Sequence, residues 1–534
     1  MIDFKKWQTV CCCLLLIGLI NSSAAIAQNK YGRLSGSFYH SGIIYQDDSK
    51  TNAVVPDDKF GSNNYLKLDY QFRKWSAGVQ FEAFTPALIG YPFEFSNKKA
   101  LATRYLSFDS QKWGATIGHF YEQLGSGLLL RAYEERTLGI NTAIDGARIW
   151  ADVLPFVRVK AMGGNQRKFM DETEGKLLAT DIDLDIAKAL KWNDLSWQMA
   201  ASMVRKSEDY TGNLNVPEEV DAFSVRSTNS WKNWSLDAEY VWKDRDPVLV
   251  NQGDNKKGNA LLITPGYSKK GLGVSLNFRR LENIDFRSER GASGLLGMIN
   301  YIPALTKQHK YALANLYPYG AQAKGEIGGQ FDIYYQLKKG TFLGGKRGAK
   351  LAINFSHYKN LKYDENGDTY FLKSGRNLLF SDFNMEYIRK WNKKVKTTFA
   401  YVNQTYNKGI LEDHAGDYKI KSNILIADVL YKFTRKKALR MEVQHLWSEQ
   451  ADKNWMYGLA EMNWAPRWSV YLSDMYNYGK TERHYYQVGG SYSANSFRFQ
   501  AGYGRNRAGL QCVGGVCRYV PAYTGLSMQL EWSF

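Results

Sequence analysis

The sequence contains no stretch of about 20 consecutive apolar residues, the length that a helix needs to cross a bilayer. This absence excludes a helical membrane protein, although 44% of the 534 residues are hydrophobic. The chain is not poor in aromatic residues either: they make up 14% of it, which excludes a disordered chain. No repeat of about 40 to 50 residues is visible, so a β-propeller is disfavoured.

Cysteines are scarce, and three of the five fall within the first 27 residues. This segment has the features of a secretory signal peptide: the basic residues Lys5 and Lys6, a short apolar stretch at 10–20, and the small-residue motif Ala25-Ile26-Ala27. The apolar stretch is too short for a membrane anchor. No small-residue motif precedes the cysteines, which disfavours a lipoprotein signal. We therefore expect residues 1–27 to be removed on export.

Export leaves two cysteines, Cys512 and Cys517, on either side of Gly514-Gly515. A Gly-Gly pair suits a two-residue hairpin turn, because both positions tolerate positive φ. Cys512 would then face Cys517 at a distance that suits a disulfide, in an oxidising compartment. Two thiols are too few for a metal site, and a redox pair usually has CxxC spacing. The sequence thus predicts a structural disulfide.

Apolar and polar residues alternate with period two from one end of the chain to the other. Clear examples are residues 65–73, 234–242, 330–337 and 497–503. This period sorts side chains onto the two faces of a strand, whereas helical spacing would not. The strands are about 10 to 13 residues long, which is long for a soluble β-sandwich but matches a tilted strand that crosses a bilayer.

Short and long connections alternate between these strands, and the expected long ones include residues 164–176 and 358–375. Eleven short connections close hairpins, and one strand precedes and one follows them, which predicts a single transmembrane antiparallel β-barrel of about 24 strands (22 to 26) over residues 28–534. Tight turns on one side and long loops on the other are typical of bacterial outer-membrane barrels. We therefore expect the bacterial outer membrane, with short turns and both termini in the periplasm and long loops outside the cell.

The last strand alternates like the others and ends in an aromatic residue. Leu530, Trp532 and Phe534 share its apolar face. A terminal strand of this kind resembles the assembly signal that the outer-membrane barrel-insertion machinery reads. The alternative is an ordinary edge strand that ends in Phe. We expect the insertion machinery to be a partner during assembly.

A barrel of this width cannot fill its interior with its own strand side chains. Charged side chains on the expected inner face need water or partners, so the lumen is either wet or closed by loops that pair with it. The expected lumen-lining residues are Lys67, Asp69, Arg73, Glu82, Asp237, Glu239, Asp332, Lys350, Arg440, Glu442 and Arg498.

One connection, residues 282–321, is long enough to need a function of its own. It is also apolar for an exposed segment, with Leu295, Leu296, Tyr301 and Leu305 among its side chains. Three alternatives remain: a lid folded into the lumen, a surface for an outer-membrane protein partner, or merely a longer hairpin. The loop at 122–144 is a second candidate for an inward fold.

The sequence offers no clear enzyme, metal or cofactor site. The seven histidines show no metal-ligand spacing. Asp413-His414 is the only adjacent pair with catalytic potential, and a solvated loop pair is the simpler interpretation. Asp364 and Asp368 resemble part of a calcium loop, but Gly367 is misplaced for an EF-hand. We therefore expect no catalytic residues, no metal and no cofactor.

Lysine and arginine exceed aspartate and glutamate by 18. On an outer-membrane surface this excess suits contact with anionic lipid headgroups or lipopolysaccharide phosphates, and in a lumen it would favour anions. Nucleic acid is the other usual partner of a basic chain. An exported barrel rarely meets nucleic acid, so we expect none.

Three segments carry a resemblance to a known family: residues 120–127 (FYEQLGSG), 301–309 (YIPALTKQH) and 512–521 (CVGGVCRYVP). They resemble an uncharacterised family of large outer-membrane β-barrels from Bacteroidota, a domain of unknown function. The resemblance covers nearly the whole exported chain. It implies the fold and the location, and it implies no activity or site residues.

Two functions are compatible with these features. The first is a porin-like channel for hydrophilic solutes, with anions as candidates, gated or partly plugged by inward loops. The second is a structural or accessory subunit of an outer-membrane complex with a plugged lumen. A TonB-dependent transporter is disfavoured, because strand-like alternation begins within a few residues of Gln28 and leaves no room for a globular plug before the barrel.

Overall fold

The computed structural model describes residues 31–51, 55–209, 216–412, 416–514 and 516–534. The expected signal peptide at 1–27 and the pair Asp413-His414 lie outside the described residues. No helix of the described residues is long and apolar enough to cross a membrane.

Twenty-four long strands form one sheet. The first twelve are β1 (Arg33–Gln46), β2 (Phe60–Phe72), β3 (Trp75–Phe84), β4 (Lys99–Asp109), β5 (Trp113–Phe120), β10 (Ile144–Leu154), β11 (Val157–Lys168), β12 (Asp171–Asp185), β13 (Leu195–Ser207), β14 (Glu219–Trp231), β15 (Trp234–Lys243) and β16 (Gly258–Lys269). The other twelve are β17 (Leu272–Glu282), β18 (Gly325–Leu337), β19 (Ala349–Tyr363), β20 (Thr369–Lys390), β21 (Val395–Asn407), β22 (Lys419–Lys432), β23 (Lys437–Trp447), β24 (Trp455–Trp464), β25 (Trp468–Asn477), β26 (Arg483–Ala494), β27 (Phe497–Asn506) and β30 (Tyr523–Ser533).

The connections contain short elements of their own. These are β6 (Gln123–Leu124), β7 (Leu130–Arg131), β8 (Glu134–Glu135), β9 (Ile140–Asn141), β28 (Gly509–Val513), β29 (Val516–Val520), α2 (Ile186–Ala189), α3 (Lys408–Leu411), η1 (Phe93–Phe95), η2 (Leu249–Asn251), η3 (Leu313–Asn315) and η4 (Gly345–Arg347).

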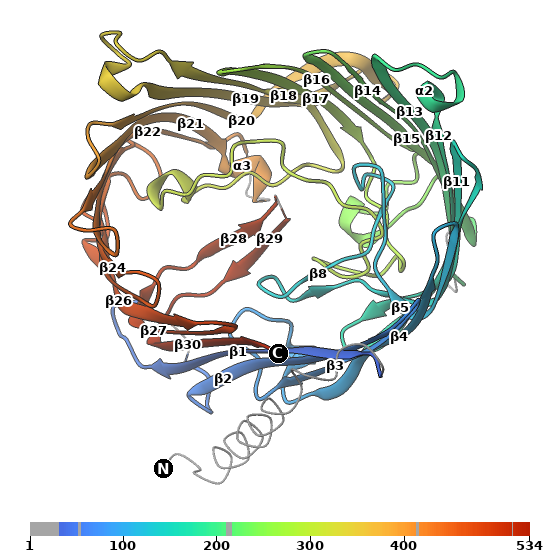
Figure 1. Cartoon of the computed structure of the whole chain (residues 1–534), viewed down its shortest axis with the longest axis horizontal. Helices are drawn as coiled ribbons and strands as arrows, with labels where there is room; N and C mark the ends of the chain where they lie inside the picture. The colour runs from blue at the N-terminus through green and yellow to red at the C-terminus, as the bar shows by residue number, and fades with distance from the viewer. Residues whose placement is uncertain (1–30, 52–54, 210–215, 413–415, 515) are drawn as a thin grey trace.

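The sheet closes on itself into a barrel (Figure 1). Each long strand pairs antiparallel with its neighbours in chain order, and β1 pairs with β30 from Ser37↔Ser533 to Gln46↔Thr524. Phe534 extends this seam, since its backbone N–H and C=O exchange two hydrogen bonds with Gly36, each 2.9 Å long. Among the described residues, this closed sheet has no unpaired edge strand. The predicted all-β barrel of 24 strands is confirmed.

Antiparallel order places alternate connections at opposite ends of the barrel. One end carries the eleven short connections, from the two residues Arg73-Lys74 to residues 338–348, and the first and last strands also begin and end there. The other end carries most of the long connections, including residues 283–324. Two connections expected to be long, near 164–176 and 358–375, are instead tight hairpins, because β11, β12, β19 and β20 extend beyond the length that a bilayer requires.

The outer face of the barrel is apolar. In β12, Leu178 and Ile182 are 62% and 44% exposed, whereas Leu177 and Ala179 on the inner face are at most 3% exposed. A continuous face of this kind is unstable in water and stable against lipid. Large aromatic side chains ring the end with the short connections, where an interfacial girdle is expected: Trp75, Trp113, Trp231, Trp234, Trp391 and Trp468, all exposed.

A charged side chain on the outer face should destabilise the barrel. Leu472, 59% exposed, lies midway along β25 on the outer face. We predict that Leu472→Arg lowers the free energy of unfolding in lipid vesicles by about 2–4 kcal/mol, because an arginine is poorly solvated at the bilayer midplane. Gln500→Arg on the inner face of β27 is the control and should cost less than about 1 kcal/mol. Equal losses in urea titrations of the two variants would contradict the assignment of the faces.

Candidate functional site

The connection between β17 and β18, residues 283–324, crosses the interior of the barrel, and we name it the crossing loop (Figure 1). On one side, the side-chain amide of Gln166 in β11 donates to the carbonyl of Met298 at 2.7 Å. On the other, the side chain of Gln444 in β23 accepts from the Leu313 N–H at 2.9 Å. These two strands are half of the circumference apart in the strand order. The crossing loop therefore joins opposite walls.

Charged side chains attach the middle of the crossing loop to β20. The ammonium of Lys307 donates to Asn384 Oδ1 at 2.8 Å and lies 2.9 Å from Glu386 Oε1. His309 Nε2 is 2.8 Å from Asp382 Oδ2. Glu386 lies only four residues before the end of β20 at the short-connection end. The crossing loop thus reaches deep into the barrel, and charge-assisted hydrogen bonds hold it there.

A buried polar cluster holds the C-terminal end of the crossing loop. Arg279 in β17 and Glu326 in β18 form an ion pair with side chains at most 1% exposed. The Tyr319 hydroxyl donates to Glu326 at 2.5 Å. Burial raises the pKa of the Tyr319 phenol well above its usual value, and the adjacent Glu326 carboxylate raises this pKa further. Tyr319 therefore remains protonated and serves as a donor.

Two further segments fold inward and contact the crossing loop (Figure 1). In the first, residues 121–143, the Leu128 carbonyl accepts from the Asn300 side chain at 3.2 Å. In the second, the β28–β29 hairpin, the Gly514 carbonyl accepts from the Tyr301 hydroxyl at 2.6 Å. The crossing loop and these two segments therefore form one assembly inside the barrel.

The inward hairpin carries the disulfide. Cys512 pairs with Cys517 in the register expected from the sequence, and their sulfurs are bonded. The predicted disulfide is confirmed. It fixes the hairpin whose tip contacts Tyr301 of the crossing loop.

The structure places ten of the eleven expected lumen-lining residues in barrel strands, and Arg73 in a short connection beyond the end of β2. Several are paired with neighbours. Glu82 forms a buried ion pair with Arg167 of β11 at 2.7 Å. Glu239 accepts from the backbone N–H of Ser126 in an inward segment at 2.9 Å. The Glu82 carboxylate is thus balanced by an arginine of the wall, and the Glu239 carboxylate accepts a hydrogen bond from an inward loop.

The remaining lumen-lining residues in strands make few polar contacts, and these are with residues of the wall. Arg440 bonds Asp428 and Glu442 within the wall. Lys67 lies 3.4 Å from Asp69. For Asp237, Lys350 and Arg498, the described residues show no ion pair. Asp332 accepts from the side chain of Asn354 at 2.6 Å.

Part of the inner wall is not attached to the crossing loop. Among the described residues, no hydrogen bond or ion pair joins the crossing loop to β27, β30 or β1. The outward side chains of this stretch include Phe499 and Leu526. The alternating inward positions include Gln500, Ser527 and Gln529, each half-buried. At β27 and β30 this stretch of wall is hydrophilic and mostly uncharged, whereas the inward side chains of β1 include the buried residues Ile43 and Tyr45.

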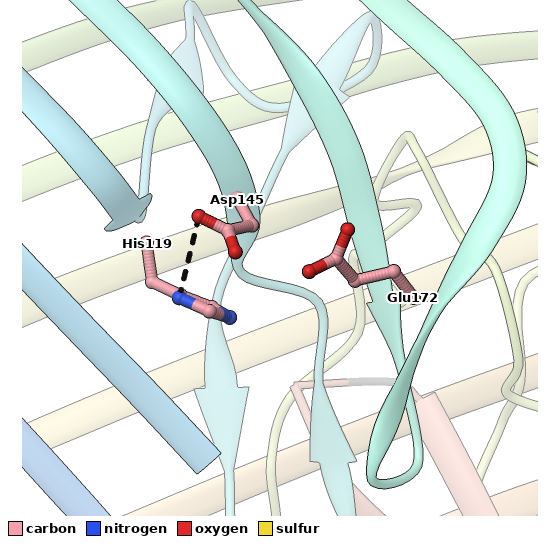
Figure 2. A group of neighbouring side chains, drawn as sticks. All are labelled: His119, Asp145 and Glu172. Carbon is pink, nitrogen blue, oxygen red and sulfur yellow. Dashed lines mark ion pairs between the residues drawn. The ribbon is translucent and has the colours of Figure 1, made fainter. Parts of the chain in front are cut away.

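Sequence reasoning missed one cluster with metal-ligand chemistry. Figure 2 shows His119 of β5, Asp145 of β10 and Glu172 of β12 turned toward one another, and one ligand atom of each lies within 4.8 Å of the others. An imidazole nitrogen and two carboxylates suit a divalent transition metal. However, the Arg104 guanidinium lies 3.0 Å from Asp145 and already balances its charge, which opposes cation binding. The three residues lie far apart in sequence, so no spacing motif marks them.

The chain belongs to a family of unknown function (DUF6029), whose profile matches residues 4–534. No curated protein matches the chain. Solved structures resemble it at low identity: the siderophore receptor PirA from Pseudomonas aeruginosa (9% identity, 94% of this chain and 80% of that chain, TM-score 0.41), the P pilus usher PapC translocation pore (8%, 94% and 99%, 0.44), and OpdK with vanillate, also from Pseudomonas aeruginosa (10%, 94% and 98%, 0.38). Identities this low do not indicate a shared activity.

The attachment of the crossing loop to β20 can be tested directly. We predict that the double substitution Lys307→Ala and His309→Ala speeds amide hydrogen exchange over residues 305–316 by about tenfold or more, because hydrogen bonds to charged groups contribute about 1.5–3 kcal/mol each. Gln308→Ala is the matched control, since Gln308 is exposed between the two substituted residues. Unchanged exchange in the double variant, measured by mass spectrometry, would show that these contacts do not hold the loop.

Proposed function

We propose that this protein is a porin-like channel of a bacterial outer membrane, and that it passes hydrophilic solutes between the crossing loop and the unattached wall. The observation that carries this proposal is the hydrophilic stretch of inner wall at β27 and β30, which no hydrogen bond joins to the crossing loop within the described residues. A barrel of 24 strands is too wide for its own side chains to fill. Water is the natural neighbour of such a wall.

The membrane assignment rests on the outer face. Exposed apolar side chains cover it, tryptophans gather at one end, and the sheet has no open edge. A closed barrel of this kind satisfies its backbone groups within lipid. By the usual pattern of outer-membrane barrels, the end with short connections faces the periplasm, which would place both termini there.

The proposed solutes are hydrophilic, and the structure gives no reason to prefer anions. Arg440 and Lys67 of the lumen lie beside carboxylates on the same wall, so their charges are balanced locally. Paired charges produce only short-range fields in salt solution. We therefore expect weak charge selectivity, with the size of the gap as the main limit to passage.

A plugged accessory subunit is the second candidate. It is favoured by the number of bonds that attach the crossing loop to opposite walls, such as those of Gln166 and Gln444. In this case the lumen would not conduct, and an outer-membrane protein partner would bind at the long-connection end, where residues 282–321 begin and end.

The C-terminal strand supports a proposal about assembly. Phe534 completes the seam against Gly36, and Trp532 packs against Phe534 with ring centroids 4.8 Å apart. We propose that the barrel-insertion machinery reads Leu530, Trp532 and Phe534 before β30 pairs with β1. Lipopolysaccharide and other outer-membrane lipids are the proposed neighbours of the outer face.

Conductance in planar bilayers distinguishes the two functions. Ile284 N–H bonds the Ala323 carbonyl at 3.0 Å, so residues 285–322 can be replaced by a two-residue Asn-Gly turn that closes a short hairpin. We predict stable channels for the natural chain and at least about twofold larger unitary conductance for this replacement, because the loop occupies cross-section. A reversal potential near zero in a salt gradient would reflect weak charge selectivity.

A control variant and a second variant distinguish the possible results of this conductance experiment. The control variant shortens the exposed turn at 364–368 on the same end of the barrel and should leave conductance unchanged. If the loop replacement does not fold, the double substitution of Lys307 and His309 to alanine should still increase the open-state current noise. No current from the natural chain, together with a co-purifying protein, would support the accessory subunit. An unchanged current after loop removal would reject the crossing loop as a constriction.

A further inference from the structure

Positive charge is concentrated at one end of the barrel. The eleven short connections contain sixteen lysines and arginines and a single carboxylate, Asp194. The connections at the opposite end contain 25 carboxylates and 18 lysines and arginines. The short-connection end therefore holds most of the formal net charge of +18. We name these sixteen residues the basic ring, because the connections that carry them follow one another around the barrel.

The side chains of the basic ring are exposed. All sixteen residues are exposed, and none of their side chains takes part in an ion pair among the described residues. Two arginines of the lumen differ from the ring, since Arg167 and Arg279 are buried and bonded to carboxylates. Sixteen like charges around one rim repel one another, so an external anion is needed to balance them.

Aromatic side chains lie directly beside the basic ring on the outer face. Trp231 precedes Lys232, whose ammonium lies 4.5 Å from the indole ring. Trp391 and Phe433 begin the connections that contain Lys393-Lys394 and Arg435-Lys436, and both aromatic side chains are about half exposed. Aromatic side chains settle at the level of lipid headgroups. The neighbouring cations are therefore at the height of the headgroup phosphates.

Residues 338–348, the longest of the eleven short connections, also combine exposed apolar side chains with cations. Phe342 is 95% exposed and Leu343 is 55% exposed. Lys338, Lys339 and Lys346 flank these apolar side chains. An apolar tip beside several cations matches the surface of an anionic bilayer, where the tip inserts and the cations meet phosphates.

We propose that the basic ring binds the anionic phospholipid headgroups of the leaflet at the short-connection end. This inference rests on the part of the proposed function that places the barrel in a membrane, and it does not require conduction. The phosphates supply the negative charge that the ring lacks, and the aromatic girdle fixes the ring at their height. The connections at the opposite end carry more carboxylates than lysines and arginines, so they attract lipopolysaccharide phosphates less strongly than the basic ring would.

The test measures which lipids remain bound to the full chain. Proteoliposomes contain phosphatidylethanolamine and phosphatidylglycerol in equal amounts, and native mass spectrometry counts the lipids retained by each barrel. We expect phosphatidylglycerol to be retained about fivefold more than phosphatidylethanolamine in low salt, since a basic residue near the surface contributes about 1 kcal/mol. High salt should reduce this ratio.

A matched pair of variants locates the effect. The ring variant carries Lys393→Gln, Lys394→Gln, Arg435→Gln and Lys436→Gln and should lower the ratio at least about twofold. The control variant carries Lys50→Gln, Lys98→Gln, Lys453→Gln and Lys480→Gln, four exposed lysines of the opposite end, and should retain the natural ratio.

Three results would overturn the proposal. They are a ratio near one for the natural chain, an equal fall in both variants, and a ring variant that loses binding to isolated peptidoglycan or to lipopolysaccharide while it retains phosphatidylglycerol. Conductance measured on the same proteoliposomes separates this inference from the channel. A lipid preference without current would refute the channel only, and current without a lipid preference would refute the basic ring only.

Discussion

Backbone pairing across the seam between β1 and β30 is the constraint on which the rest of the structure depends. Lipid offers no hydrogen-bond partner, so each N–H and C=O of a spanning strand must find one in a neighbouring strand. Closure provides this partner for the first and last strands, and the bonds of Phe534 with Gly36 extend the pairing to the final residue. With no edge remaining, the apolar outer face can be continuous.

A closed barrel of 24 strands has an interior too wide for its own strand side chains to fill. The crossing loop fills part of this interior. Its apolar residues, such as Leu313 and Tyr311, form one cluster with the wall residues Ile424 and Ile426. The crossing loop also places Lys307 beside Glu386, so that a charge inside the barrel has a partner. The inner wall at β27 and β30 has no hydrogen bond to the crossing loop among the described residues. In the proposed channel, water and solutes pass along this wall and the crossing loop is the constriction.

The sequence predicts what depends on local periodicity. Alternation in residues 65–73 and its repeats specify the strands and their number, and the Gly-Gly turn specifies the register of Cys512 with Cys517. Long-range placement is not encoded in any local pattern. Nothing near Lys307 indicates that it meets Glu386, and nothing in the spacing of His119 and Asp145 indicates that they meet. The basic ring could not be predicted from local sequence. The end of the barrel at which a run such as Arg435-Lys436 lies is known only once the order of the strands is known.

We propose that one face of each strand contacts lipid while the other contacts the lumen or its loops. A nitroxide placed in turn at each residue of 424–431 in β22 tests it most directly, with collision rates measured for dissolved oxygen in bilayers. We expect high rates at Leu425, Ala427 and Val429 and low rates at Ile424 and Ile426, which pack against the crossing loop. Uniformly low rates along this stretch, as in a sheet covered on both faces by protein, would contradict it.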